Sequence, residues 1–261
     1  MKRRLRLPGV PVFVYHGIAE GAETISPGDR KYWVRVSELK QHLNHIRANG
    51  HAISLAQLTD RSMTPNPVVI TFDDGRLSDY EFAYPELQKA GMTAEFFVNT
   101  AKVGTRGFAD WSQLREMQHA GMSIQSHAHD HVDLALLAEG DLERQLSVSK
   151  NMIEERLGTA VQFLAAPYGR LNAKLIEIAL KVGYRSVCSA RSIPAQYGAT
   201  KIDRVVLHRD MPLKEFAQYF DRDPVRYLRR ISRSLRYRWP LSVLCRPASS
   251  RLQHDSVEGY Q

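Results

Sequence analysis

The sequence has little cysteine and no long apolar run. Only two of its 261 residues are cysteines, Cys188 and Cys245, which lie far apart and form no C-x-x-C pair. This argues against a disulfide framework and against a cysteine-based zinc site. No run of roughly 18 apolar residues is present either, so we expect no membrane-spanning helix.

An apolar segment is also missing after the basic N-terminus. Residues 1–6 read MKRRLR, and the chain then passes directly to Pro8 and Gly9. A secretory signal peptide requires an apolar stretch after such a basic start. We therefore expect a cytoplasmic protein.

Basic residues outnumber acidic ones. The chain has 36 Lys and Arg against 28 Asp and Glu, a formal net charge of +8. Such an excess favours anionic partners such as a phospholipid surface, a lipid-linked sugar phosphate or nucleic acid. It is concentrated in residues 1–6 and 222–251 and comes with no recognisable nucleic-acid-binding motif, so we expect no nucleic-acid partner.

Short β-branched or aromatic runs alternate with segments of helical period, and glycine often marks the junction. The pattern predicts strands at residues 10–15, 68–72, 93–98, 123–126, 161–165 and 205–208. It predicts helices at residues 36–46 (with Gly50 as the C-cap), 79–90, 111–120, 141–157 and 172–182. This alternation indicates an α/β fold, a distorted (β/α)-barrel. We assign residues 1–222 to a catalytic domain and residues 223–261 to a basic amphipathic tail, partly disordered.

Two adjacent carboxylates follow the predicted strand at residues 68–72. Asp73 and Asp74 lie in the segment T-F-D-D-G, which ends at Gly75. In βα barrels the functional groups lie where strands end. Because neighbouring side chains on an extended segment point in different directions, one carboxylate could bind a cation while the other acts as a base. A solvated Asp-Asp-Gly turn is the alternative.

Three histidines follow the predicted strand at residues 123–126. His127 and His131 are four residues apart, and one helical turn would place both imidazoles on one face. With one carboxylate they would form a two-histidine, one-carboxylate metal site. His129 is interpreted as a bystander or as a group that supports the ligands. Metal binding explains this cluster better than core packing does.

A rigid turn follows the predicted strand at residues 161–165. Pro167 fixes the backbone and Gly169 allows it to turn, so the N–H of Tyr168 could serve as an oxyanion-hole donor. A simple Pro-Tyr-Gly turn is the alternative.

Together these segments resemble the polysaccharide deacetylase family, also called the NodB-homology domain or carbohydrate esterase family 4. That family shows T-F-D-D-G, then H-[S/T]-x-x-H, then R-x-P-Y. Here the first motif is complete, the second has Ala128 in place of Ser or Thr, and the third has Ala165 in place of its arginine. The resemblance covers about residues 10–220. Arg170 and Arg204 are the two candidates to replace the missing arginine, which orients the catalytic base in the family.

The resemblance implies roles for individual residues. Asp73 would be the catalytic base, and one divalent metal ion would be held by Asp74, His127 and His131, with zinc as the default and cobalt, nickel or iron also suited to these ligands. Pro167 and Tyr168 would contact the substrate, and Tyr168 would also stabilise the oxyanion.

Two further histidines are candidates for the active site. Residues 14–17 resemble the Tyr-His strand of members that act on poly-N-acetylglucosamine and other exopolysaccharides, which would place His16 near the substrate; a structural histidine is the alternative. Residues 205–208 loosely match the family's final Leu-x-Ile-His motif. His208 would then be the general acid, and a surface histidine at a strand edge is the alternative.

The implied function is metal-dependent removal of acetyl groups from N-acetylated sugars of an exopolysaccharide, an envelope glycan or a lipid-linked precursor. A non-catalytic carbohydrate-binding homologue is the alternative, with Ala165 as its only support. The arginine-rich segment at residues 224–247 has apolar members such as Leu228, Ile231 and Leu235. It predicts peripheral contact with the inner face of an anionic membrane; a helix packed on the barrel is the alternative.

Overall fold

Parallel strands form the centre of the molecule. The computed structural model describes residues 5–21 and 30–236, with residues 231–236 described by their backbone. A nine-stranded parallel sheet has the order β10-β9-β8-β7-β6-β5-β1-β11, and β4 also pairs with β5. The strands of this sheet are β1 (Val12–Tyr15), β4 (His51–Ala52), β5 (Pro67–Phe72), β6 (Glu95–Val98), β7 (Ser123–Ser126), β8 (Phe163–Ala165), β9 (Ser186–Cys188), β10 (Lys201–Ile202) and β11 (Val205–Val206). A small second sheet pairs β2 (Ile18–Ala19) with β3 (Val34–Arg35).

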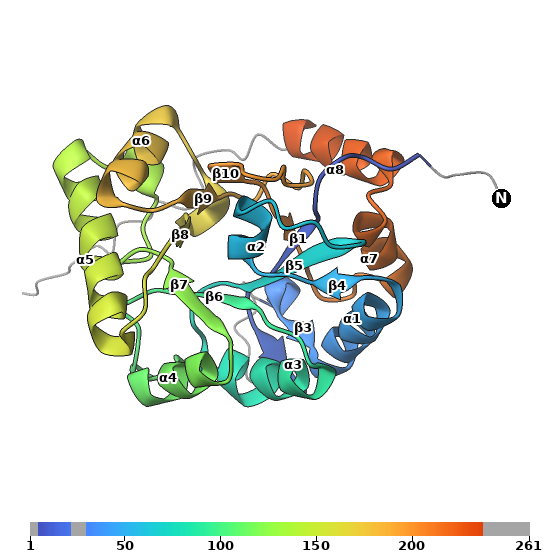
Figure 1. Cartoon of the computed structure of the whole chain (residues 1–261), viewed down its shortest axis with the longest axis horizontal. Helices are drawn as coiled ribbons and strands as arrows, with labels where there is room; N and C mark the ends of the chain where they lie inside the picture. The colour runs from blue at the N-terminus through green and yellow to red at the C-terminus, as the bar shows by residue number, and fades with distance from the viewer. Residues whose placement is uncertain (1–4, 22–29, 237–261) are drawn as a thin grey trace, which may run out of the picture.

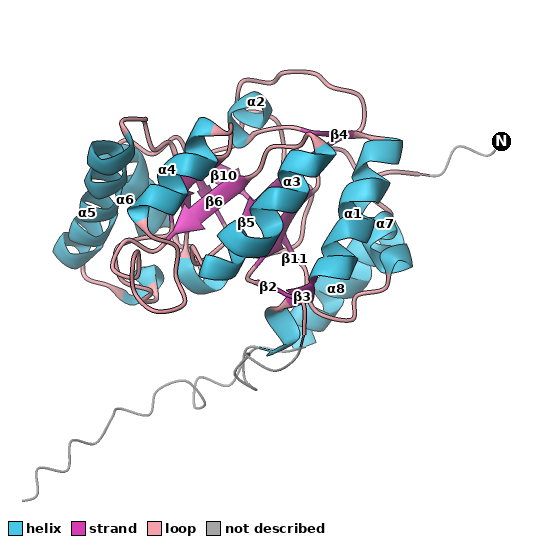
Figure 2. Cartoon of the chain, turned by 90° about the horizontal axis from the view of Figure 1, so that it is seen from below, coloured by secondary structure: helices cyan, strands magenta, loops and turns pink. Residues whose placement is uncertain are grey.

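Helices cover the outer side of this curled sheet. Figures 1 and 2 show α5 and α6 at one end, α1, α7 and α8 at the other, and α3 and α4 between them. The helices are α1 (Val36–Asn49), α2 (Leu55–Thr59), α3 (Tyr84–Ala90), α4 (Trp111–His119), α5 (Glu139–Leu157), α6 (Ala173–Val182), α7 (Leu213–Phe220) and α8 (Pro224–Arg236). A π-helical turn, η2 (Asp79–Ala83), precedes α3, and η1 (Arg30–Tyr32), η3 (Leu134–Leu136) and η4 (Pro167–Gly169) are short 3-10 helices.

The barrel is open at one seam. β10 and β11 stand at the two ends of the strand order and are joined by Asp203 and Arg204 alone. Within the described ranges, no ladder pairs these two strands. The predicted α/β class and distorted (β/α)-barrel are therefore confirmed, and Arg204 lies at the seam.

Both faces of the sheet are buried. All six residues of β5 are buried, as expected for a parallel strand covered on both sides. On the helix-facing side Phe72 stacks on Phe96 with ring centroids 4.7 Å apart, while Val69 and Phe97 belong to a second cluster inside the barrel. This packing holds the carboxyl ends of the strands together at one edge.

The predicted role of Gly50 as the C-cap of α1 is confirmed, and its N–H donates to the backbone oxygen of Ile46 at 2.8 Å. Its φ of −172° is extended, and a Cβ there would lie 2.2 Å from the backbone oxygen of Asn66. Close approach between the end of α1 and the segment before β5 therefore requires glycine at this position. Predicted helices at residues 79–90, 111–120, 141–157 and 172–182 correspond to η2 with α3, α4, α5 and α6, with ends shifted by up to two residues. The sequence pattern did not predict α7, β9 or the short elements α2, β2, β3, β4 and β10.

The beginning of the basic tail packs on the barrel. The side chain of Tyr227 is fully buried and donates to the backbone oxygen of Tyr219 at 3.1 Å. Arg230 donates to the backbone oxygen of Val206 at 2.9 Å, and Arg226 forms an ion pair with Glu215. These contacts give no support to membrane docking through this part of α8. Residues 237–247 of the proposed docking segment lie outside the described residues.

None of the helices in the described ranges has both the length and the apolar character needed to cross a bilayer.

Candidate active site

Each of the three motif segments turns at a non-glycine residue with positive φ. Asp74 has φ of +79°, Ala128 of +64° and Tyr168 of +61°. Such backbone costs on the order of 1–3 kcal/mol per residue and persists only where the surroundings enforce it. All three follow parallel strands, β5, β7 and β8, so they meet at the same edge of the sheet.

Asp74, His127 and His131 come together at this edge. One ligand atom from each lies within 4.8 Å of the others. Asp74 Oδ1 is 3.5 Å from His127 Nε2 and 3.4 Å from His131 Nε2. Asp74 and His127 are buried, whereas the side chain of His131 is 33% exposed. The open side of the cluster is therefore next to His131.

The expectation of a helical turn between the two histidines is wrong. Residues 127–131 form an irregular loop, and the left-handed Ala128 inside it reverses the chain. The two imidazole centroids still lie 5.2 Å apart. His127 Nδ1 lies 2.8 Å from the backbone oxygen of Ala165, which leaves Nε2 directed at Asp74. His129 pairs instead with the hydroxyl of Thr100 at 2.9 Å and ties two loops together.

This cluster fits a divalent metal ion. Asp74 Oδ1 is buried, and no described residue forms a hydrogen bond with it. Such an oxygen costs free energy unless a cation or donor occupies the space it faces. Two imidazole nitrogens and one carboxylate oxygen are ligands that suit zinc and other first-row transition metals.

Asp73 faces a different partner. Arg204 Nη1 and Nη2 donate to the two carboxylate oxygens of Asp73, each at 2.7 Å. The same guanidinium donates from Nε to the backbone oxygen of Ser189 and from Nη1 to the Thr71 hydroxyl, each at 3.1 Å. Arg204 is 1% exposed. Of the two candidates for the missing family arginine, Arg204 therefore contacts Asp73, whereas Arg170 pairs with Asp133.

Burial and neighbouring charged groups set the protonation state of the two carboxylates. Burial raises the pKa of Asp73, but the Arg204 guanidinium outweighs it, so the net pKa lies below the usual value. For Asp74, burial also raises the pKa, but the neighbouring imidazoles of His127 and His131 outweigh it and hold the pKa well below the usual value. Both carboxylates are therefore ionised at neutral pH.

His16 lies beside Asp73. Its Nε2 is 3.9 Å from Asp73 Oδ2, and its ring packs on Tyr32 with centroids 5.6 Å apart. Burial lowers the pKa of His16, although the charge of Asp73 partly offsets this effect. His208 follows β11, which pairs with β1, and its Nδ1 contacts the backbone oxygen of Arg209 at 3.1 Å. In the described part of the chain, no hydrogen bond or ion pair connects His208 with Asp73.

Tyr168 covers His131. Their ring centroids are 4.9 Å apart in an edge-to-face arrangement, and the Tyr168 hydroxyl donates to the backbone oxygen of His131 at 3.4 Å. The side chain of Tyr168 is largely exposed and that of Pro167 is buried. A Cβ on Gly169 would lie 2.5 Å from the Cβ of Ala190, and its φ is +66°. The turn therefore brings Tyr168 next to the metal cluster and fits only glycine after it.

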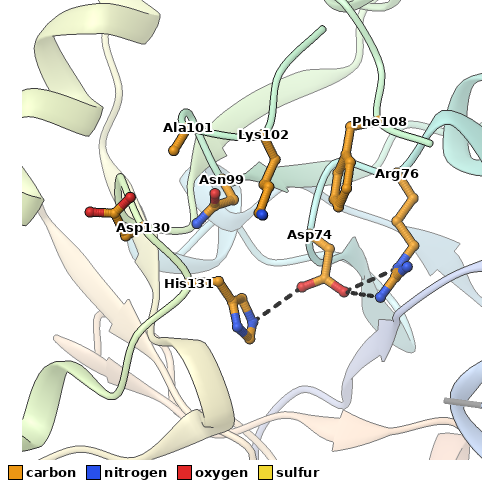
Figure 3. Close-up of a pocket in the computed structure, with 8 residues that line it drawn as sticks. All are labelled: Asp74, Arg76, Asn99, Ala101, Lys102, Phe108, Asp130 and His131. Atoms are coloured by element: carbon orange, nitrogen blue, oxygen red, sulfur yellow. Dashed lines mark hydrogen bonds and ion pairs between the residues drawn. The ribbon is translucent and has the colours of Figure 1, made fainter. Parts of the chain in front are cut away.

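A pocket of about 420 Å³ opens beside the cluster (Figure 3). Asn99, at the end of β6, is 1% exposed, and neither atom of its side-chain amide has a hydrogen-bond partner among the described residues. The pocket is lined by Asp74, Arg76, Asn99, Ala101, Lys102, Phe108, Asp130 and His131.

Known proteins are similar to this chain in sequence. Residues 60–187 match the family model for polysaccharide deacetylase. The chain belongs to the polysaccharide deacetylase family. It is 28% identical over 208 residues to YxkH of Bacillus subtilis, whose name places it among the polysaccharide deacetylases, with 77% of this chain and 70% of that protein covered.

Two further relatives are informative. The poly-beta-1,6-N-acetyl-D-glucosamine N-deacetylase of Escherichia coli K12 is 28% identical over 237 residues, which covers 71% of this chain but 35% of that protein. The deacetylase PplD of Streptococcus pyogenes, solved in complex with acetate, superimposes with a TM-score of 0.74 at 23% identity and covers 83% of this chain and 99% of that one. The similarity to PplD establishes the fold.

The sequence did not identify several residues of this family member's site. Arg76 directly follows the T-F-D-D-G motif, and this position was the only signal for it. Asn99, Lys102 and Phe108 follow β6 in a segment without any motif. The sequence left Arg204 as one of two candidates for the missing family arginine. It could not decide between them, because Asp73 lies 131 residues before Arg204 and their contact depends on the fold.

Proposed function

We propose that this deacetylase-family chain hydrolyses the acetamido group of N-acetylated sugars with the help of one divalent metal ion. The observation that carries the proposal is the pair Asp73 and Asp74. One carboxylate faces two imidazoles, and its neighbour faces a buried arginine. The two adjacent acids therefore have different environments, as the division into ligand and base requires.

The proposed ligands are Asp74, His127 and His131. A bound divalent ion supplies Lewis acidity at this position, which polarises a carbonyl group and makes water easier to deprotonate. Zinc is the default, and cobalt, nickel and iron also suit this ligand set.

Asp73 is the proposed general base. Arg204 holds both of its oxygens and keeps it ionised, so it can accept the proton of the attacking water. The Tyr168 N–H is the proposed donor to the oxyanion, because the turn at Pro167 positions this residue over His131.

We assign the general acid to His16 rather than to His208. His16 lies 3.9 Å from Asp73 and is 27% exposed, so its imidazole can reach a substrate beside the base. It could deliver a proton to the leaving amine. His208 has its described contact with the neighbouring backbone instead. Products would be acetate and a sugar with a free amine.

The substrate class is a polymeric or lipid-linked glycan that carries N-acetyl groups. The similarity to the Escherichia coli poly-beta-1,6-N-acetyl-D-glucosamine N-deacetylase supports an exopolysaccharide. The alternative of a non-catalytic carbohydrate-binding homologue depended on Ala165. Arg204 contacts Asp73 in place of the missing family arginine, so Ala165 no longer supports that alternative.

The test is acetate release from chitin oligomers, poly-N-acetylglucosamine and lipid-linked acetamido sugars. Each substrate is incubated with metal-depleted protein, with and without added Zn²⁺ or Co²⁺. We expect release that depends on metal. His127→Ala and His131→Ala proteins, analysed for bound metal, serve as controls and should lose both metal and activity. Release that is equal with and without metal would contradict metal dependence, and no release from any substrate would contradict the proposed activity.

A further inference from the structure

The two oxygens of Asp74 have different partners. Oδ1 faces the Nε2 atoms of His127 and His131. Oδ2 accepts a hydrogen bond from Arg76 Nε at 3.2 Å and forms an ion pair with Nη2 at 3.0 Å (Figure 3). One oxygen is thus directed at the proposed metal and the other is held by a guanidinium.

Arg76 is itself held from several sides. Its guanidinium carbon lies 5.2 Å from the ring centroid of Trp33 and 5.9 Å from that of Phe108. Its backbone N–H donates to Asp79 Oδ2 at 3.1 Å, and its backbone forms a β-bridge with Phe108. The side chain of Arg76 is 23% exposed. A planar guanidinium fixed in this way imposes its geometry on the carboxylate that it binds.

We infer that Arg76 is a positioning residue that restricts Asp74 to binding the metal through Oδ1 alone. This inference rests on the proposed metal-dependent function. A carboxylate with one oxygen engaged by a fixed guanidinium, through a hydrogen bond and an ion pair, is held from turning to offer both oxygens to a cation. Two imidazoles and a single carboxylate oxygen give three protein ligands, which is the number found in catalytic zinc sites that keep a position open for water and substrate.

Electrostatics alone predicts the opposite effect of removing Arg76. A positive charge beside the site repels a divalent cation, so its loss would tighten metal binding. Loss of positioning would weaken binding, because removal of groups that orient metal ligands costs about 10–100-fold in affinity. The sign of the change therefore separates the two roles.

The test is titration of metal-depleted wild-type, Arg76→Ala and Arg76→Lys proteins with Co²⁺, followed by visible absorption. Co²⁺ with few ligands absorbs more strongly than Co²⁺ with six. We expect the dissociation constant of the Arg76→Ala protein to rise by about 10–100-fold and its visible band to weaken. Lysine keeps the charge but lacks the planar guanidinium that fixes Asp74 Oδ2, so Arg76→Lys should also bind more weakly than wild type.

Arg170→Ala is the matched control, because it removes another arginine–aspartate pair, with Asp133, at the same rim. It should leave the cobalt spectrum unchanged. Thermal unfolding of the metal-free proteins shows whether each variant folds, and if Arg76→Ala does not, Arg76→Lys decides. Tighter or unchanged binding, or an equal change in the Arg170→Ala protein, would overturn the inference. Failure of the wild-type protein itself to bind Co²⁺ would count against the proposed function instead.

Discussion

Arg204, at the seam of the barrel, holds both carboxylate oxygens of Asp73 at 2.7 Å. Arg204 lies between β10 and β11, whereas the family's arginine would come from the position of Ala165 at the end of β8. By the resemblance to the family, an arginine at position 165 would contact the same carboxylate from β8. A guanidinium can therefore move to another element of the barrel while its contact with the base is kept.

Replacement of Arg204 by alanine should destabilise the protein and reduce activity. Removal of one partner of a buried ion pair leaves an uncompensated charge and costs about 3–5 kcal/mol. Urea unfolding of the metal-free protein measures this cost. Arg185→Ala, which breaks the exposed pair with Asp60, should cost at most about 1 kcal/mol. A similar cost in the two variants would show that the buried pair contributes no more to the free energy of unfolding than the exposed pair does.

An arginine at position 165 should partly rescue the loss of Arg204. The double variant Ala165→Arg, Arg204→Ala returns the guanidinium to the position that the family uses. We expect more stability and activity than in Arg204→Ala alone. The single variant Ala165→Arg places a second cation into a filled, fully buried site and should be destabilised. A double variant no better than Arg204→Ala would show that β8 cannot present the guanidinium to Asp73 in this chain.

Asp73→Asn should keep the metal and lose most activity. The amide is close in size to the carboxylate but cannot accept the proton from water, and general-base catalysis contributes about 10²–10⁴-fold in rate. Elemental analysis and acetate release are measured on the same sample. Turnover near that of wild type would mean that another group is the base, and loss of metal would mean that Asp73 also supports the ligands.

His16 and His208 differ in their expected contribution. His16→Ala should lower kcat by about 10²–10⁴-fold if this imidazole is the general acid, because it lies beside Asp73. His208→Ala should have a smaller effect. An acetylated substrate with a better leaving group needs less acid catalysis, so it should restore activity to His16→Ala more than to Asp73→Asn. A larger loss in His208→Ala than in His16→Ala would reverse the assignment.

The sequence predicted the barrel and the three site segments because both depend on local patterns. Buried parallel strands are continuous apolar runs, as in β5, and the polar residues that follow them mark the functional edge. The histidine spacing pointed to a site although its geometric reason was wrong, since Ala128 turns the loop where a helix was expected.

Contacts between distant segments could not be predicted in the same way. The ion pair between Arg204 and Asp73 depends on how the barrel curls and where its seam lies, and nothing local at either residue encodes that. The same holds for Gly50, whose neighbour Asn66 comes from another segment. A glycine after a helix usually indicates a left-handed cap, and only the tertiary contact shows that close approach is the reason here.

A buried histidine behind the site should make stability depend on pH. His42 in α1 is 2% exposed, its Nδ1 lies 3.0 Å from the Tyr15 hydroxyl, and its ring stacks on Phe216 at 4.1 Å. Burial, with a smaller effect of His45, lowers the pKa of His42 from 6.5 to about 4. The folded protein therefore binds this proton less readily than the unfolded chain does.

The free energy of unfolding should fall as the pH decreases from about 6.5 to about 4 and lose no more from this group below that range. A difference of this size corresponds to roughly 3 kcal/mol. In His42→Gln an amide can replace the hydrogen bond to Tyr15 without titrating, so the decline should be smaller than in wild type. Urea unfolding at several pH values measures it, with His119→Gln on the exposed end of α4 as the control. Parallel declines in wild type and His42→Gln would assign the pH dependence to other groups.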